Sequence, residues 1–224
     1  MIIVVEGTSA AGKTTWCRQF ATSQVLCEGQ PTPDPAPEGA SDPNPGNPSA
    51  AAEYWVGVNA RRWTTARDLS ERLGWVVCDT DPFKLHWTWS LWVAGLASSE
   101  YWEASRHLFR SAFADGRLGL PDLVLFADLD PETLRRQKAG DPTRTRSRHD
   151  LHIRISAALK RWYLAMAALD PARVVFRLPA NGLEIGHLQL GPRPQRSGAP
   201  LFDRLMAELD ARRDPSAAPH PPLT

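Results

Sequence analysis

The chain has 224 residues, of which 42% are hydrophobic and 23% are charged, enough apolar material for the core of one globular domain. The formal net charge is +1, so the overall charge gives no reason to expect nucleic acid or an anionic membrane as a partner. The three cysteines form no CxxC pair, which indicates free thiols in a reducing compartment rather than a disulfide framework. The sequence shows neither a signal-peptide pattern nor a run of about 18 apolar residues, and we therefore expect a cytoplasmic protein.

Four apolar segments predict the strands of a parallel sheet. The first of them is β-branched and apolar without alternation, which is typical of a strand buried on both faces of a parallel sheet. These segments are residues 1–5, 75–81, 122–130 and 173–178.

Segments with helical spacing separate these strands. Trp16, Cys17 and Phe20 share one face of a helix that starts near Lys13, and a proline opens the helix at residue 131. Further helices are expected near residue 65 and over residues 83–97, 100–114, 151–169 and 201–212. The alternation of strands and helices predicts an α/β fold with a parallel sheet, formed by a single domain over residues 1–212. Residues 213–224 are rich in proline and are expected to be a flexible tail.

A proline-rich segment follows the first helix. Seven prolines lie between residues 31 and 48, with Gly, Asp, Asn, Ser and Ala among them. Such a segment is unsuited to burying apolar surface or to sustaining a hydrogen-bond ladder. We expect a disordered insertion over residues 29–49, and a tolerated surface loop is favoured over a regulated lid.

The segment "GTSAAGKTT", residues 7–15, fits the pattern G-x-x-x-x-G-K-[ST] at every position, between a predicted strand and a predicted helix. Its glycines allow backbone N–H groups to point at phosphate oxygens, and the helix N-terminus adds partial positive charge. Lys13 is expected to reach the β- and γ-phosphates and Thr14 to bind Mg²⁺. A capped turn would explain Gly7 and Thr14, but not the lysine. The expected nucleotide-binding residues are Gly7, Thr8, Ser9, Ala10, Ala11, Gly12, Lys13, Thr14 and Thr15.

With this loop the sequence resembles the P-loop kinase group: nucleoside, nucleotide, shikimate and gluconate kinases and the antibiotic phosphotransferases. The resemblance implies a P-loop NTPase-type parallel sheet of about five strands with helices on both faces. It also implies that the protein uses ATP and Mg²⁺.

The segment "CDTDPFKLH" places Asp79 and Asp81 at the end of a predicted strand, where ligands bind in an open α/β sheet. It resembles the D-x-D of shikimate and gluconate kinases. The resemblance implies that Asp79 helps to hold Mg²⁺ through water and that Asp81 binds or deprotonates the acceptor. A turn with aspartate caps before Pro82 is the alternative. An aromatic ring at His86 or Trp87 could stack on a ring-bearing acceptor.

Positive charge is concentrated in residues 132–154, where seven basic and three acidic residues give +4 and leave −3 for the rest of the chain. The pattern "LDPETLRRQK…TRTRSRH" resembles the arginine-bearing lid of nucleotide and nucleoside kinases. It implies a lid over residues 139–150 whose guanidinium groups contact the transferring phosphate. A solvated basic loop and contact with RNA are the alternatives. The expected contacts are Arg136, Arg144 and Arg148, with Arg146 close behind, whereas His149 and His152 are expected to be surface or lid residues.

These features predict an ATP-dependent kinase that phosphorylates a hydroxyl or phosphate of a nucleoside-like, nucleotide-like or natural-product acceptor. Lys13, Asp81 and the lid arginines would be catalytic, and by resemblance Asn181 and Gly182 would contact adenine. The partner is then a small molecule; neither nucleic acid nor a membrane is expected, and a homodimer is compatible with the sequence. The alternative is a nucleotide-dependent ATPase switch that acts on a protein partner, with Asp128 or Asp130 as its strand acid.

Overall fold

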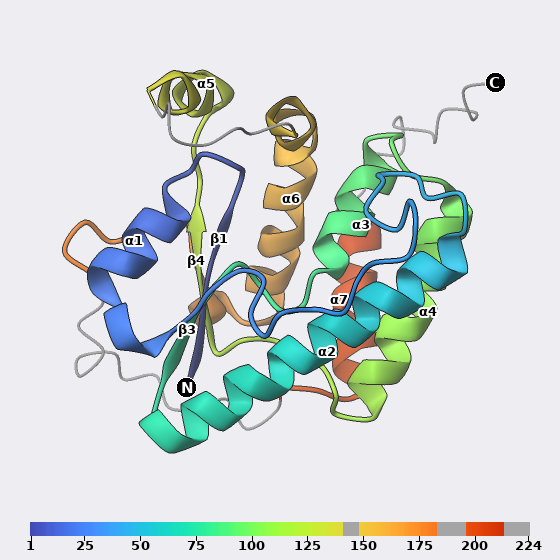
Figure 1. The fold of residues 1–224 in the computed structure, drawn as a ribbon, viewed down its shortest axis with the longest axis horizontal. Helices are drawn as coiled ribbons and strands as arrows, with labels where there is room; N and C mark the ends of the chain where they lie inside the picture. The colour runs from blue at the N-terminus through green and yellow to red at the C-terminus, as the bar shows by residue number, and fades with distance from the viewer. Residues whose placement is uncertain (141–147, 183–195, 213–224) are drawn as a thin grey trace.

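A computed structural model describes residues 1–140, 148–182 and 196–212 of the chain (Figure 1). The predictions for Arg144, Arg146, most of the lid and the tail over residues 213–224 lie outside the described residues. Within the described part of the chain, no helix has the length and apolar character needed to cross a membrane.

Five parallel strands form one sheet in the order β2-β3-β1-β4-β5, which confirms the predicted fold class. The strands are β1 (Ile2–Gly7), β2 (Val25–Leu26), β3 (Val76–Asp79), β4 (Leu123–Ala127) and β5 (Val174–Val175). Val5 pairs with Asp79 and Gly7 pairs with Ala127, so the carboxyl ends of the three central strands meet at one edge. Ligands of open α/β sheets bind at that edge.

Helices cover both faces of the sheet (Figure 1). On one face, α1 (Lys13–Phe20) packs Trp16 and Cys17 against Ile3 and Val5 of β1. On the other face, an aromatic core surrounds Phe83. The helices of that face are α2 (Pro48–Leu73), α3 (Leu85–Val93), α4 (Ser99–Ala114), α6 (His149–Leu169) and α7 (Ala199–Ala211). The remaining helix, α5 (Pro131–Ala139), follows β4.

Helix α2 is one continuous helix, where the sequence indicated a helix only near residue 65. Asn47 caps its N-terminus by accepting a hydrogen bond from Ala50 N, and Pro48 takes the first helical turn, where its missing N–H costs nothing. Gly74, with a φ of 83°, ends the helix. The last two residues of the expected insertion 29–49 therefore belong to α2.

The rest of the proline-rich segment, residues 29–47, carries no helix or strand. It nevertheless buries apolar surface: Ala40 is 3% exposed and packs with Ala51, Ala52 and Tyr101. The expectation that this segment cannot bury apolar surface is wrong, because side chains of neighbouring helices pack against it and donate hydrogen bonds to its carbonyl groups. Its disorder in solution stays a prediction.

Candidate active site

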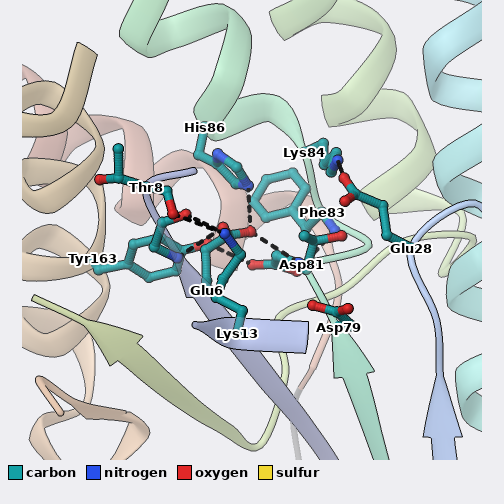
Figure 2. Close-up of polar contacts among 12 residues, drawn as sticks. Glu6, Thr8, Lys13, Glu28, Asp79, Asp81, Phe83, Lys84, His86 and Tyr163 are labelled. Atoms are coloured by element: carbon teal, nitrogen blue, oxygen red, sulfur yellow. Dashed lines mark hydrogen bonds and ion pairs between the residues drawn. The ribbon is translucent and has the colours of Figure 1, made fainter. Parts of the chain in front are cut away.

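The loop between β1 and α1 has the tightly curled backbone that its glycines permit. Gly7 has a φ of 144°, and a Cβ at this position would lie 2.9 Å from the Cβ and the carbonyl oxygen of Ala127. Gly12, with a φ of 77°, leads into the first turn of α1. Lys13 Nζ donates hydrogen bonds to the carbonyl oxygens of Gly7 (2.8 Å) and Thr8 (3.0 Å), so its ammonium group lies over the loop (Figure 2).

A first cavity of about 420 Å³ lies against this loop. Every loop residue from 7 to 15 except Thr8 lines it, together with Arg18 and Lys84. The N-terminus of α1 and three cationic side chains thus face one space, which is the arrangement that binds anions such as phosphate. The sequence pattern predicted the loop residues that line this cavity. It did not predict Lys84 as a lining residue, because Lys84 follows the acidic segment and belongs to no familiar motif.

Asp79 and Thr14, the predicted metal ligands, lie next to each other. Asp79 is 3% exposed, and its Oδ1 has no hydrogen-bond partner among the described residues. Burial raises the pKa of Asp79, while a hydrogen bond with the Thr14 side chain and the charge of Lys13 oppose this rise. A buried carboxylate oxygen beside a hydroxyl fits Mg²⁺, which prefers oxygen ligands and keeps several waters. The described residues contain no cluster of three or more His, Cys, Asp or Glu residues for a metal, so Mg²⁺ would need phosphate oxygens and water as further ligands.

Glu6, which the sequence analysis overlooked, is a buried carboxylate that also lines the first cavity. Its oxygens accept hydrogen bonds from Gly7 N (2.8 Å) and Asp81 N (3.0 Å), and His86 Nε2 lies 3.4 Å from Oε2 (Figure 2). Burial alone would raise the pKa of Glu6, but His86, Lys13 and Lys84 outweigh it and lower the pKa below its ordinary range. Glu6 therefore ties the start of the loop to the chain that follows β3. An acid that interrupts an apolar strand was the available clue.

Asp81 lies in the interior of the protein, and its predicted contact with an acceptor stays a prediction. Asp81 is 0% exposed, and it lines neither the first cavity nor the second cavity next to it. Its carboxylate accepts hydrogen bonds from Phe83 N (2.8 Å) and Tyr163 Oη (3.1 Å). Burial raises the pKa of Asp81 to about 6, although His86 opposes the rise. Thr80 has a φ of 71°, and this left-handed turn takes the chain away from the strand direction after Asp79. The two carboxylates therefore enter different surroundings.

A second cavity of about 210 Å³ adjoins the first, because Glu28, Lys84, Trp87 and His152 line both. Glu28 follows the two-residue strand β2 and forms an ion pair with Lys84 at 2.8 Å (Figure 2). The charge of Lys84 lowers the pKa of Glu28, so this carboxylate is ionised at neutral pH. Glu28 was missed because two apolar residues are too few to be recognised as a strand.

Aromatic rings form part of the wall of the second cavity. Its described lining includes the rings of Trp55, Trp87, Tyr101 and Phe109, together with Asn59 and Thr88. Asn59 is 2% exposed, and its Nδ2 has no hydrogen-bond partner within the described part of the chain. A buried amide without a partner is costly unless a ligand satisfies it.

The predicted lid residues that can be described do not gather at the loop. Arg136 lies exposed on α5, donates to Thr133 Oγ1 (3.0 Å) and lines neither cavity. Arg148 lines the second cavity rather than the first, and its Nη1 donates to Ser41 O (2.7 Å). His152, expected at the surface or in the lid, lines both cavities beside Trp87, with ring centroids 4.9 Å apart. Burial and Lys13 lower the pKa of His152 to about 4.

The acids expected of an ATPase switch have other partners. Asp128 pairs with Lys160 at 2.7 Å, and Asp130 caps α5 by accepting from Thr133 N at 2.9 Å. Neither of them lines the first cavity. Gly182 lies beside Phe20 of α1, and the predicted contact of residues 181 and 182 with adenine stays a prediction.

Fold and loop together define a class of protein: a parallel α/β domain with a glycine-rich loop between its central strand and its first helix. Among solved structures, the chain is similar to deoxyadenosine kinase from M. mycoides with bound dATP, with a TM-score of 0.53, 12% identity and coverage of 92% of this chain and 99% of that chain. It is also similar to the same enzyme with the products dCMP and a flexible dCDP bound, with a TM-score of 0.51, 11% identity and coverage of 94% and 100%. At this identity the likeness concerns the fold alone. No protein-family model matches the sequence, and no curated protein matches it either.

Proposed function

We propose that the protein is a kinase that uses ATP and Mg²⁺ to phosphorylate a hydroxyl group of a neutral, nucleoside-like small molecule. The observation that carries this proposal is a pair of cavities that meet at Glu28. The glycine-rich loop lines the first cavity. Aromatic rings and the Asn59 amide, which has no hydrogen-bond partner in the described part of the chain, line the second. The fold shared with deoxyadenosine kinase supports the kinase class.

The first cavity would take the triphosphate. Backbone N–H groups of the loop and the N-terminus of α1 would donate to phosphate oxygens, and Lys13 would exchange its two carbonyl partners for the β- and γ-phosphates. Thr14 and Asp79 would hold Mg²⁺, which neutralises charge on the phosphate oxygens.

Glu28 is the best-placed group to receive the acceptor's proton. Among the described acidic side chains it alone lines both cavities, so it can reach a hydroxyl held at their junction. In the proposed step, the acceptor oxygen forms a bond to the γ-phosphorus while the bond from that phosphorus to the β–γ bridging oxygen breaks. ADP leaves, and the hydroxyl proton passes to the Glu28 carboxylate and then to solvent.

The charges around the second cavity favour a neutral acceptor. Glu28 and Lys84 pair with each other, and the remaining charged side chains of the described lining, Asp42 and Arg148, are opposite in sign. His152 adds no charge at neutral pH because of its lowered pKa. The cavity therefore has no excess cation for a phosphate-bearing acceptor, which favours a nucleoside over a nucleotide.

The uncharged groups favour a planar ring with a polar edge. Indole and phenyl rings offer faces and edges on which a nucleobase can stack. Asn59 offers an unpaired amide donor that a ring nitrogen or carbonyl oxygen can accept. A purine or pyrimidine satisfies both requirements, and its sugar then carries the hydroxyl.

The test is ADP release from ATP in the presence of deoxyadenosine, deoxycytidine, adenosine or dAMP, and without acceptor. We expect release that depends on a nucleoside and is weaker with dAMP. Lys13→Ala and Glu28→Gln should each lower kcat/KM by at least about a hundredfold. Glu38→Gln changes an exposed glutamate that lines neither cavity and serves as the matched control. Equal ADP release without any acceptor would contradict the proposal and favour an ATPase.

A further inference from the structure

The proline-rich segment lies at the wall of the second cavity. Ala40, Ser41 and Asp42 line that cavity, opposite residues of α2, α3, α4 and α6. In Figure 1 the segment leaves the sheet and runs to the side of the molecule where α3 and α4 lie, before the chain enters α2. The segment thus reaches a functional cavity instead of projecting as a detached surface loop.

Three helices hold the segment by its backbone and side chains. From α2, Tyr54 Oη donates to Asp34 O and Trp55 Nε1 donates to Ala40 O, both at 2.7 Å. At the start of α4, Ser98 N donates to Asn44 Oδ1 at 2.9 Å. Proline-rich backbone offers many carbonyl acceptors and few N–H donors, so donors from neighbouring helices are the means of fixing it.

The third attachment comes from α6. Arg148, at the N-terminal end of that helix, donates from Nη1 to Ser41 O at 2.7 Å, and both residues line the cavity. A guanidinium bound to this carbonyl fixes the wall at the point where it faces the acceptor. The contact also accounts for an arginine that lies away from the phosphate loop.

We propose that residues 39–44 determine which acceptors the second cavity admits and that Arg148 is a positioning residue that holds this wall through Ser41. The inference rests on the proposed function, because it concerns the acceptor cavity of that reaction. Ala40 is buried in the wall, so a larger side chain there must enter the cavity or displace the wall. Either change alters the space for a purine more than the space for the smaller pyrimidine.

The first experiment compares kcat/KM for deoxyadenosine and deoxycytidine at saturating ATP. Ala40→Leu should lower the ratio of kcat/KM for deoxyadenosine to kcat/KM for deoxycytidine by about tenfold, in keeping with the discrimination that a few buried carbons provide. The KM for ATP should stay unchanged. Arg148→Ala should raise the KM for both nucleosides without raising the KM for ATP, and Arg148→Lys should restore part of the loss. Glu38→Ala, in the same segment but outside the cavity, should leave all constants unchanged.

The outcomes separate the two proposals. If the wild-type protein phosphorylates neither nucleoside, the proposed function fails and this inference fails with it. If the wild-type protein is active but Ala40→Leu leaves the ratio unchanged, or Arg148→Ala lowers kcat equally for every acceptor with unchanged KM, the inference alone fails. The second result would mean that Arg148 acts on the transferring phosphate.

Hydrogen exchange of the wild-type protein provides a readout that needs no variant. The backbone N–H groups of residues 39–42 and 44 should exchange more slowly when deoxyadenosine or deoxycytidine is added, while adding ATP alone should have little effect there. Unprotected exchange of these amides both with and without nucleoside would mean a disordered segment and would overturn the inference.

Discussion

Replacing Asp81 with asparagine distinguishes a structural carboxylate from a catalytic one. The Asp81 side chain is fully buried, accepts hydrogen bonds from Phe83 N and Tyr163 Oη, and lies near the ionised Glu6. An asparagine keeps the shape, accepts from Phe83 N through Oδ1 and can donate from Nδ2 to the Tyr163 oxygen. The substitution therefore removes a buried charge while the hydrogen bonds can be kept.

The expected gain in stability follows from the pKa of Asp81, which burial raises from 3.8 to about 6. The Asp81 carboxyl group binds its proton more tightly in the folded state than in the unfolded state. Its contribution to stability is therefore fully present below pH 3.8 and is lost as the pH rises through about 6. The neutral asparagine avoids that loss. Asp81→Asn should therefore raise the free energy of unfolding by about 1 to 3 kcal/mol at pH 7.5, and the gain should shrink towards zero near pH 4.

Urea denaturation of wild type and variant at pH 7.5 and 4.5, together with kcat/KM at pH 7.5, measures both roles. Asp34→Asn is the matched control, because Asp34 is an exposed aspartate in a surface ion pair with Arg61, and its replacement should change stability by less than about 0.5 kcal/mol. A less stable Asp81→Asn variant at pH 7.5 would refute the burial reasoning. A stable variant that has lost more than about a hundredfold in kcat/KM would restore a catalytic role for Asp81.

Three further substitutions test the loop and the core. Gly7→Ala should weaken ATP binding and destabilise the protein by more than about 1 kcal/mol, because its Cβ would meet Ala127 at 2.9 Å and its φ is 144°; calorimetric titration and thermal unfolding measure the two effects. Gly57→Ala lies within α2, and beyond the adjoining helix backbone the new Cβ would meet only Arg61 Nη1, at 3.9 Å; it should instead stabilise by about 0.5 to 1 kcal/mol, and a destabilised variant would show that α2 is not helical there. Arg196→Met should destabilise by about 3 to 5 kcal/mol in urea denaturation, because it leaves the buried Asp122 carboxylate without the guanidinium that donates to it at 2.8 Å; an unchanged midpoint would mean that this ion pair is not formed.

The loop 7–14 and its two flanking elements could be predicted from sequence because the motif carries its own structural context. A buried strand, glycines at two of the three positive φ angles and an eight-residue helix all lie within residues 2–20. The longer strands β3 and β4 were equally visible as apolar segments. Strand β2 was not, because Val25 and Leu26 become a strand only by pairing with Val77 and Cys78 of β3. Glu28 was lost with that strand.

The surroundings of the acidic pair and of the proline-rich segment depend on tertiary contacts that the sequence pattern does not contain. Two carboxylates separated by one residue would share a face in a regular strand, but the left-handed φ of Thr80 separates them. Threonine rarely adopts a positive φ, so the sequence does not predict that turn. The proline-rich segment lacks its own donors, and the donors that hold it come from Tyr54, Trp55 and Arg148. The composition of the segment does not show which side chains elsewhere in the chain donate hydrogen bonds to it.

A crystal structure of the protein grown with ATP and Mg²⁺ tests the nucleotide site most directly. We predict that the triphosphate lies in the first cavity, with its oxygens on the backbone N–H groups of residues 7–14 and within hydrogen-bond distance of Lys13 Nζ, which has moved from the carbonyl oxygens of Gly7 and Thr8. A triphosphate bound anywhere else, with Lys13 still on those two carbonyl groups, would contradict the proposed kinase.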